Sequence, residues 1–283
     1  MLDFGTSNDN SNYYDFGDLA ALEFTDDFSV GFFGYVDTLA GTWQTWFSKV
    51  DATNGWVFRS GSGHSNKPAL VIGDGGGFDV YLATTVLNAD TTVRNYVAAF
   101  DESAHQTDFY VDGSADGSPT NSRNVTAAAS ATVEINDSAA AGSLGSSGAR
   151  GHVCAWSKYL SSAEAAEFSA GQTMPAPGNL VFWMRGLVDP PLEQQNLATG
   201  SKTGTVTVES HAVDGYFQDS DYMTWVLAEI FMPFLLAAGA GANLMGDVTN
   251  MLRSMSRRCT LDWTHSELKT LTEAFRTRPS FVY

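Results

Sequence analysis

Four aspartates in glycine-rich turns are residues whose types could bind a metal ion. Asp74 and Asp79 flank the glycines of GDGGGFD, and Asp112 and Asp116 belong to DGSADG. Carboxylate oxygens are ligands that Ca²⁺ prefers, so these residue types are compatible with a calcium site. DGSADG lacks the ligand alternation of an EF-hand loop, and aspartate is common in turns for backbone reasons. An ordinary turn without a metal is the alternative interpretation.

Aromatic residues near the N-terminus could form a surface on which sugar rings stack. The candidates are Tyr13, Tyr14, Trp43 and Trp46. Aromatic side chains of a sandwich are also large contributors to the core, which is the alternative for each of them. Trp43 and Trp46 differ by an odd number of positions, so in a regular strand they face opposite sides. At most one of the two tryptophans should therefore lie in the core, and the other should meet a glycan, a neighbouring subunit or a covering loop.

Residues suited to catalysis are not arranged as any familiar mechanism requires. Glu23 and Glu134 have acidic neighbours, but neither belongs to the closely spaced carboxylate pairs that glycoside hydrolysis uses. His152 and Cys154 lie two apart on one expected strand; a buried cysteine beside an edge histidine explains them better than a thiol nucleophile does. GDGGG is not followed by GK[ST], so it does not predict a phosphate-binding loop. We expect the protein not to be an enzyme.

Charge is distributed unevenly along the 283 residues. Residues 1–220 contain 26 of the 32 carboxylates and 9 of the 15 lysines and arginines, whereas residues 221–283 contain six of each. An acidic domain is a poor partner for nucleic acid, because affinity for phosphates comes from lysine and arginine. The two cysteines lie in no metal-binding motif. The stretch MLDFGTSNDN has neither a basic segment nor an apolar core, so we expect no secretory signal.

Up to about residue 160 the sequence predicts strands joined by turns. Turn signals such as DATNG and NADTT separate short aromatic and β-branched segments, a spacing typical of an antiparallel sandwich. The predicted strands are 29–37, 43–50, 55–61, 67–73, 78–87, 94–101, 107–113 and 179–186. Between the last two lies one predicted helix. It should begin with a capping box of Ser161 and Glu164 and end at Gly171.

Three segments together resemble a known family. They are the opening LDFGTSNDNSNYYDFGDLAALEFTDDFSVGFFGYV, the hairpin TDFYVDGS at 107–114, and the closing strand and helix HVCAWSKYLSSAEAAEFSAG at 152–171. In order and type they are similar to the laminin-G-like branch of the concanavalin A-like lectin/glucanase jelly rolls. The resemblance implies a mainly β fold, an antiparallel β-sandwich of the jelly-roll kind. It also implies that a calcium ion at the sheet edge would be bound by aspartates such as those above.

The order of segments suggests a rearranged domain. The segment FWMRGLVDPPLEQQNLATGSKTGTVT (182–207) resembles the strand that normally begins such a domain, but here it follows the body. We interpret residues 172–220 as permuted strands that close the same sandwich, since a lone strand pair could not bury its face. The sequence thus predicts a laminin-G-like sandwich over 1–220 and a helical anchoring or assembly segment over 221–283.

The long apolar run WVLAEIFMPFLLAAGAGANLM (225–245) could be a membrane span or a buried assembly surface. It is long enough to cross a bilayer, but an acidic residue, a proline and an asparagine make insertion marginal. The arginines after the run would keep the C-terminus in the cytoplasm, which would require the acidic domain to cross the membrane. Burial against protein is therefore favoured. The predicted anchoring residues are Trp225, Ile230, Phe231, Phe234, Leu235, Leu236, Arg253, Arg257 and Arg258.

Together these observations predict a virion structural protein. Laminin-G-like jelly rolls are frequent in tailed-phage structural proteins, so we expect a capsid decoration or surface-displayed adhesion protein that assembles in the host cytoplasm. Its partners would be the capsid or sister subunits in a homo-oligomer, with a cell-surface glycan as a further ligand. No cofactor other than the candidate calcium is expected. The alternative is a glycan-binding adhesin anchored in a membrane at the cell surface. This expectation rests on fold-level analogy.

Overall fold

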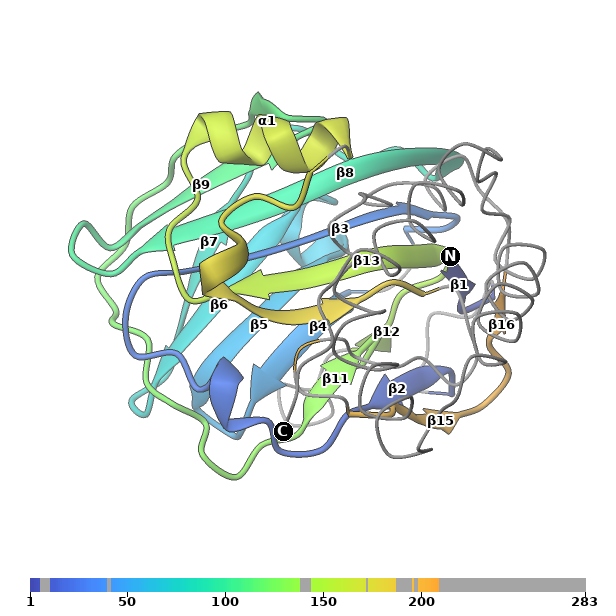
Figure 1. The fold of residues 1–283 in the computed structure, drawn as a ribbon, viewed down its shortest axis with the longest axis horizontal. Helices are drawn as coiled ribbons and strands as arrows, with labels where there is room; N and C mark the ends of the chain where they lie inside the picture. The colour runs from blue at the N-terminus through green and yellow to red at the C-terminus, as the bar shows by residue number, and fades with distance from the viewer. Residues whose placement is uncertain are drawn as a thin grey trace, which may run out of the picture. The chain divides into compact units, whose positions relative to one another are not determined.

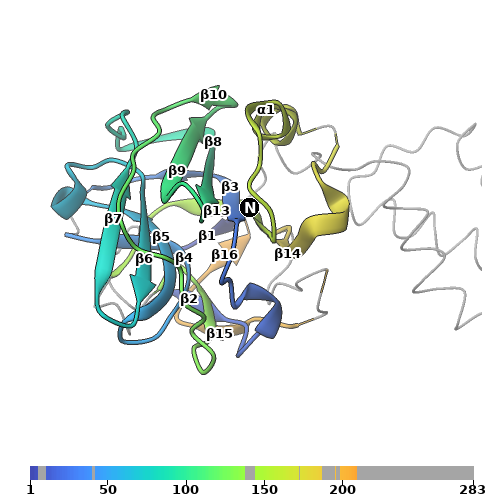
Figure 2. The same ribbon diagram turned by 90° about the vertical axis from the view of Figure 1, so that its left-hand side faces the viewer.

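A computed structural model describes residues 1–5, 11–39, 42–137, 144–171, 173–186, 195 and 198–208. All of them belong to the first of the two units into which the chain divides, Met1–Phe217. They form two sheets that pack face to face (Figures 1 and 2). The predicted mainly β, antiparallel sandwich is therefore confirmed, whereas the helical segment predicted over 221–283 lies outside the described residues.

The first sheet has the strand order β10-β9-β8-β3-β13-β1-β16, and β14 pairs with β13 as well. All its neighbouring strands are antiparallel. Its strands are β1 (Leu2–Asp3), β3 (Phe28–Val36), β8 (Asp90–Asp101), β9 (Gln106–Val111), β10 (Ser114–Ala115), β13 (Ala149–Trp156), β14 (Leu180–Met184) and β16 (Thr207–Val208).

The second sheet has the order β15-β2-β11-β4-β5-β6-β7. It is antiparallel except that β12 runs parallel to β4. Its strands are β2 (Tyr13–Asp15), β4 (Gln44–Val50), β5 (Asn54–Ser60), β6 (Ala69–Asp74), β7 (Phe78–Leu82), β11 (Val133–Ile135), β12 (Leu144–Gly145) and β15 (Ser201–Thr203). Three 3-10 turns, η1 (Ala20–Leu22), η2 (Ser62–His64) and η4 (Pro177–Asn179), connect elements of the sandwich.

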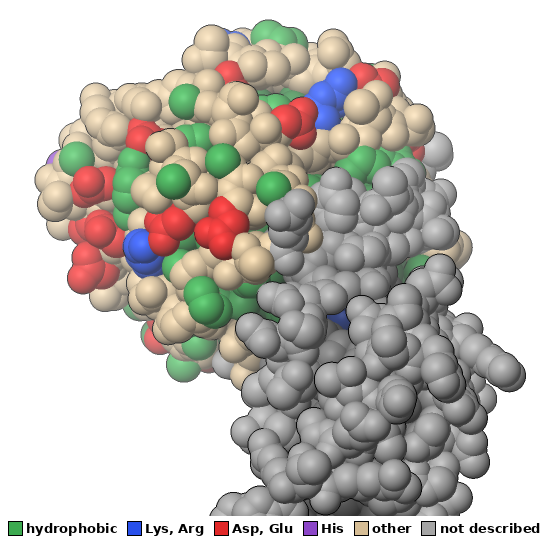
Figure 3. Space-filling model, turned by 45° about the horizontal axis from the view of Figure 1, so that its top comes forward, with side chains coloured by type: hydrophobic (Ala, Val, Ile, Leu, Met, Phe, Trp, Pro, Cys, Tyr) green, Lys and Arg blue, Asp and Glu red, His purple; other side chains and the backbone are tan. Residues whose placement is uncertain are grey.

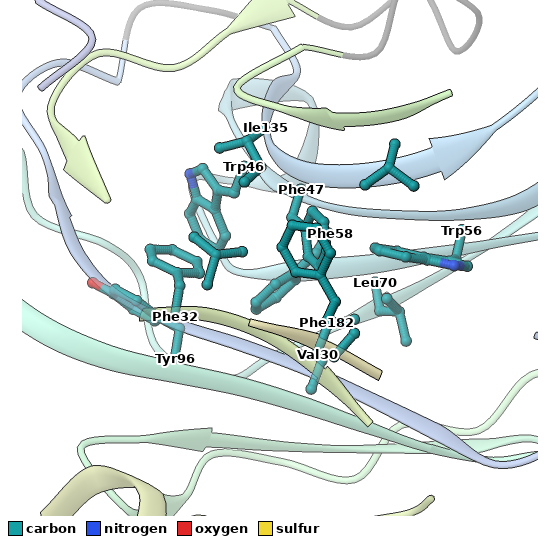
Figure 4. Packing of buried hydrophobic residues seen from close by; sticks show 14 of the residues in the cluster. Val30, Phe32, Trp46, Phe47, Trp56, Phe58, Leu70, Tyr96, Ile135 and Phe182 are labelled. Atoms are coloured by element: carbon teal, nitrogen blue, oxygen red, sulfur yellow. The ribbon is translucent and has the colours of Figure 1, made fainter. Parts of the chain in front are cut away.

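The core between the sheets is rich in aromatic rings (Figure 4). The Trp46 ring lies 5.0 Å from the ring centroids of both Phe32 and Phe58 and 5.3 Å from that of Tyr96. These residues come from strands of both sheets, so their contacts hold the two layers together. Aromatic pairs with such edge-to-face and tilted geometry add to the free energy of burial.

The helix α1 (Ser162–Ala170) covers the side of the first sheet that faces away from the second sheet (Figure 2). Ser161 and Glu164 form the predicted capping box, and Gly171 ends the helix in the left-handed region with φ of 66°. Phe168 packs its ring 5.1 Å from those of Phe33 and Trp156. Because the core covers one face of β3 and α1 covers the other, all nine residues of β3 are buried.

Candidate functional site

The four predicted stacking aromatics are not on one surface. Tyr14 and Trp46 are fully buried in the core, so the prediction of a surface role for these two residues is wrong. Strand alternation explains the error, because both side chains point between the sheets, where large aromatic faces are buried. Tyr13 is half-buried on β2, near the sheet edge. Trp43, which directly precedes β4, is 38% exposed and is the candidate that remains at the surface with a large free ring.

Trp43 is held in place by a buried arginine. The Arg59 guanidinium carbon lies 4.9 Å from the centroid of the Trp43 ring, which is within the range of a cation–π interaction. Arg59 Nε donates a hydrogen bond of 2.9 Å to His64 Nε2. Arg59 and His64 are each only 6% exposed. One face of the indole therefore rests on a fixed cation, while 38% of the residue stays exposed to solvent.

The loop around η2 fixes the edge of the same ring. A Cβ added at Gly63 would lie 2.4 Å from Trp43 Nε1, so only glycine allows this close approach. Gly63 N donates to the carbonyl of Thr42 at 2.8 Å. Further along the loop, Ser65 and Asn66 have positive φ values of 54° and 56°. Consecutive left-handed residues other than glycine are costly, and such strain is concentrated at functional sites.

Burial controls protonation beneath Trp43. Loss of hydration, followed by the charge of Arg59, lowers the pKa of His64 to about 4. The imidazole is therefore neutral near pH 7, and its Nε2 can accept the hydrogen bond that Arg59 Nε donates. Burial also lowers the pKa of Arg59 to about 10, so the guanidinium keeps its charge. This group of Trp43, Arg59 and His64, which we call the Trp43 platform, provides a rigid apolar ring above a fixed charge. That arrangement is suited to binding a flat apolar face.

The first pair of candidate calcium ligands is occupied by an arginine. Arg123 Nη1 pairs with Asp74 Oδ1, and Arg123 Nε lies 3.2 Å from Asp79 Oδ1. Asp79 Oδ2 also accepts from the backbone nitrogens of Ser122 and Arg123, at 3.0 and 3.1 Å. These two carboxylates fasten the segment after Pro119 to the β6–β7 turn, which gives Asp74 and Asp79 a structural role.

The second pair serves backbone turns. Asp112, with φ of 50°, accepts from the backbone nitrogen of Asn95 at 2.8 Å. Asp116 is buried and accepts from both the nitrogen and the hydroxyl of Thr85, at 3.0 and 2.7 Å. Within the described ranges no three His, Cys, Asp or Glu side chains gather as a metal site would require. The described residues thus do not gather Asp74, Asp79, Asp112 and Asp116 into one metal site, which favours the alternative interpretation of ordinary turns.

His152 and Cys154 lie on β13 of the first sheet and are covered by other side chains. Both residues are buried, and His152 has a φ of 46° where the register between β13 and β3 shifts. The imidazole stacks on the ring of Trp183 with centroids 6.3 Å apart. Cys154 is fully buried and not disulfide-bonded. A reagent in solution has no access to this thiol, so the geometry favours packing over nucleophilic catalysis.

The predicted anchoring residues cannot be placed. Trp225, Ile230, Phe231, Phe234, Leu235, Leu236, Arg253, Arg257 and Arg258 all lie outside the described residues. Within the part of the chain that the structure describes, no helix has the length and apolar character needed to cross a membrane.

Sequence reasoning did not find Arg59 and His64 as partners of Trp43. They lie in FRSGSGH, whose residue spacing does not predict a contact with Trp43. The contact forms because the η2 loop folds back to the residues just before β4. The serine- and glycine-rich character of this segment was the available signal, because it predicts a tight loop. The described part of the face shown in Figure 3 is mostly uncharged, and acidic side chains are more common on it than lysines and arginines.

Known structures share the fold. A heptameric SAP-like pentraxin from Limulus polyphemus superposes with a TM-score of 0.53 at 12% identity, over 75% of this chain and 95% of that one. A putative carbohydrate-binding protein from Bacteroides ovatus superposes with a TM-score of 0.50 at 14% identity, over 75% of this chain and 60% of that one. At such low identity these similarities show the fold alone. No curated protein sequence matches the chain.

The sequence itself matches a laminin G-type family model, described as the concanavalin A-like lectin/glucanases superfamily, over residues 8–166. This match spans more than half of the chain and contains the strands from β2 to β13 together with the first part of α1. The chain therefore belongs to the concanavalin A-like lectin/glucanases superfamily.

Proposed function

We propose that this protein binds carbohydrate through the Trp43 platform and does not hydrolyse it. The observation that carries the proposal is the exposed Trp43 ring, held from behind by Arg59 and at its edge by Gly63. The C–H face of a sugar ring is apolar and matches an aromatic face, while the indole edge and nearby polar groups can meet hydroxyls. Membership in a superfamily of lectins and glucanases supports a sugar ligand.

Binding without catalysis is supported by the groups around the ring. Glycoside hydrolysis needs two carboxyl groups on either side of the scissile bond. Among the described residues, the groups around Trp43 include instead a guanidinium, a backbone glycine and, through Arg59, a neutral histidine. The structural similarity to a putative carbohydrate-binding protein is in keeping with this proposal.

A glycan array followed by calorimetric titration tests the proposal, with Trp43→Ala as the test variant. We expect the variant to lose binding to any glycan that the natural protein captures, while its melting temperature changes little because the side chain is at the surface. Leu82→Ala is the matched control, since Leu82 is also 38% exposed. Ala69 pairs with Arg59 on one side and with Leu82 on the other, so Leu82 lies on the same sheet face as Arg59. Unchanged glycan binding by Trp43→Ala would show that the sugar binds elsewhere.

We further propose that the sandwich is displayed by a virion structural protein, a capsid decoration or adhesion protein, with residues 221–283 attaching it to the capsid or to sister subunits. The support is in the sequence: a neutral segment with one long apolar run follows a strongly acidic domain. An apolar run interrupted by Glu229, Pro233 and Asn243 suits burial against protein better than insertion into lipid.

Detergent dependence separates this role from its alternative, a glycan-binding adhesin anchored in a membrane. The 21-residue apolar run is the observation that keeps the alternative in view. A virion protein should stay dispersed and oligomeric without detergent and should co-purify with particles. Sedimentation with membranes after a carbonate wash would favour the adhesin.

A further inference from the structure

A pocket lies apart from the Trp43 platform, whose residues do not line it. It is a surface pocket of about 450 Å³ between the segment that leads into β3 and the segment that follows β13. Its lining includes Glu23, Phe24, Asp26, Asp27, Lys158 and Asn179. The volume is within the range of about 300–1,000 Å³ that is usual for small-molecule sites. The acidic residues here are part of a cavity that also contains an aromatic ring, an ammonium group and an amide.

The apolar part of the pocket is rigid. Phe24 is 6% exposed and stacks on Phe28, with ring centroids 4.5 Å apart and planes at 11°. Trp56 lies behind both rings, its centroid 5.9 Å from each of theirs. Because these rings belong to the core, the apolar wall of the pocket is preformed and needs no ordering when a ligand binds.

Some polar atoms of the pocket form no hydrogen bond with the described residues. Asp26 Oδ1 accepts from the backbone nitrogen of Asp27, and Asp27 Oδ1 accepts from that of Glu102, both at 2.9 Å. Among the described residues, neither Oδ2 atom has a partner, and neither does the side-chain amide of Asn179. One oxygen of each carboxylate therefore fixes its orientation, and the other is available as an acceptor.

The charge of the pocket selects the kind of ligand. The Lys158 ammonium pairs with Glu164, and Glu23 is partly balanced by Lys49, whose Nζ lies 3.7 Å away. The carboxylates of Asp26 and Asp27 form no ion pair with a described residue. A net charge of −17 for the whole chain adds a long-range attraction for cations. We propose that this pocket binds a primary ammonium group, carried by a small ligand with an apolar or hydroxylated body that rests against Phe24.

This site is separate from the proposed glycan site. Glu23 contacts Lys49 near the end of β4, whereas Trp43 precedes the start of the same strand. Six residues of extended chain between them correspond to about 20 Å. The two sites can therefore be tested independently, and failure of one does not affect the other.

The experiment measures binding of three small probes to the full chain at low salt by ligand-observed NMR and calorimetry. Glucosamine and lysine amide carry a primary ammonium on a sugar and on an amino-acid body; N-acetylglucosamine has the same sugar without the charge. We expect at least one amine to bind and N-acetylglucosamine to bind at least about ten-fold more weakly, which corresponds to the loss of two partly exposed charge contacts. The amine that binds more tightly identifies the source of the ammonium group.

Asp26→Asn/Asp27→Asn is the test variant, because asparagine keeps the acceptor that orients each side chain and removes the charge. It should weaken amine binding about ten-fold. Trp43→Ala should leave amine binding unchanged, and the melting temperatures of both variants should confirm that they fold. Equal binding of glucosamine and N-acetylglucosamine, no binding of either amine, or displacement of the amine by calcium at equal concentration would each overturn the proposal.

Discussion

Arg150 places a charged guanidinium inside the fold. It is fully buried, and burial lowers the pKa of its guanidinium to about 10. Its Nη1 donates to the carbonyls of Tyr35 and Ala149 at 2.8 and 3.0 Å, and its Nη2 donates to Ser146 and Ser147. No carboxylate of the described residues pairs with it. Backbone carbonyls and the Phe32 ring therefore take the place of a counter-ion.

Arg150→Ala should lower the free energy of unfolding by about 3 kcal/mol or more, because it leaves a cavity and several buried acceptors without donors. Arg94→Ala is the matched control: Arg94 pairs with Asp90 at the surface, and its loss should cost less than about 1 kcal/mol. Urea unfolding monitored by tryptophan fluorescence gives both values. Equal effects in the two variants would contradict a structural role for the buried guanidinium.

At the residue scale, the sequence predicted which side chains can lie in the core better than it predicted which residues form a functional site. The odd spacing of Trp43 and Trp46 correctly implied that at most one of them is in the core. The sequence could not show which one, because the choice depends on where β4 begins and on the register shift between Thr45 and Phe47. The aspartates of the turns gave no sign that Arg123, 44 positions after Asp79, would occupy two of them.

At the scale of elements, α1 illustrates how local chemistry decides a boundary. The Ser161 hydroxyl accepts from the Glu164 backbone nitrogen, and the Glu164 carboxylate accepts in return from the Ser161 nitrogen at 2.9 Å. The first turn of the helix is satisfied by its own sequence, so the position of the helix was predictable without knowledge of the fold. The residues that the helix covers were not predictable, since Phe33 and Trp156 come from distant strands.

Ser161→Ala should destabilise the protein by about 1 kcal/mol, since it removes the capping acceptor. Ser162→Ala is a close control, because Ser162 is also exposed and lies one position inside the helix, where its hydroxyl makes no capping bond. Thermal unfolding of the two variants side by side measures the difference. A larger effect at Ser162 would show that the cap contributes little.

Long strands were predicted closely, whereas the short strand β11 was missed. The predicted segments 29–37 and 55–61 differ by one residue at each end from β3 and β5. β11, with three residues, has no periodicity to recognise and gains its order from pairing with both β2 and β4. Short strands of this kind depend on partners far away in the chain.

At the scale of the whole molecule, the closing strands join the two ends of the sandwich sequence. β16 pairs with β1 in the first sheet, and β15 pairs with β2 in the second. The N-terminal strands are thus completed by residues about 200 positions later, which no local pattern can show. That these residues reflect a permutation of the family's usual order stays our interpretation.

The acidic surface should govern stability at low pH. The pKa values of Asp74, Asp90, Asp101, Asp108 and Glu164 all lie below their usual range. For Asp90 the side-chain hydrogen bond from Arg94 lowers the pKa from 3.8 to about 2. A depressed folded-state pKa stabilises the protein fully above the unfolded value, and this contribution is lost as the pH falls through the folded value.

The free energy of unfolding should therefore decrease as the pH falls from about 4 to about 2. Asp90→Asn should reduce the steepness of that decrease, because the variant has no carboxylate to protonate at this position. Chemical unfolding at a series of pH values measures both slopes. An unchanged slope in the variant would mean that the Asp90–Arg94 pair is formed equally in the unfolded chain.

The last described strands also determine how the sandwich would respond to tension. Any pull transmitted from beyond residue 208 arrives first at β16 and β15, whose pairings comprise two and three residues. Because these strands border opposite sheets, the pull would act on β16 in the first sheet and then on β15 in the second before it reaches the aromatic interior. These short pairings would then break and re-form under load, while the two packed sheets stay intact.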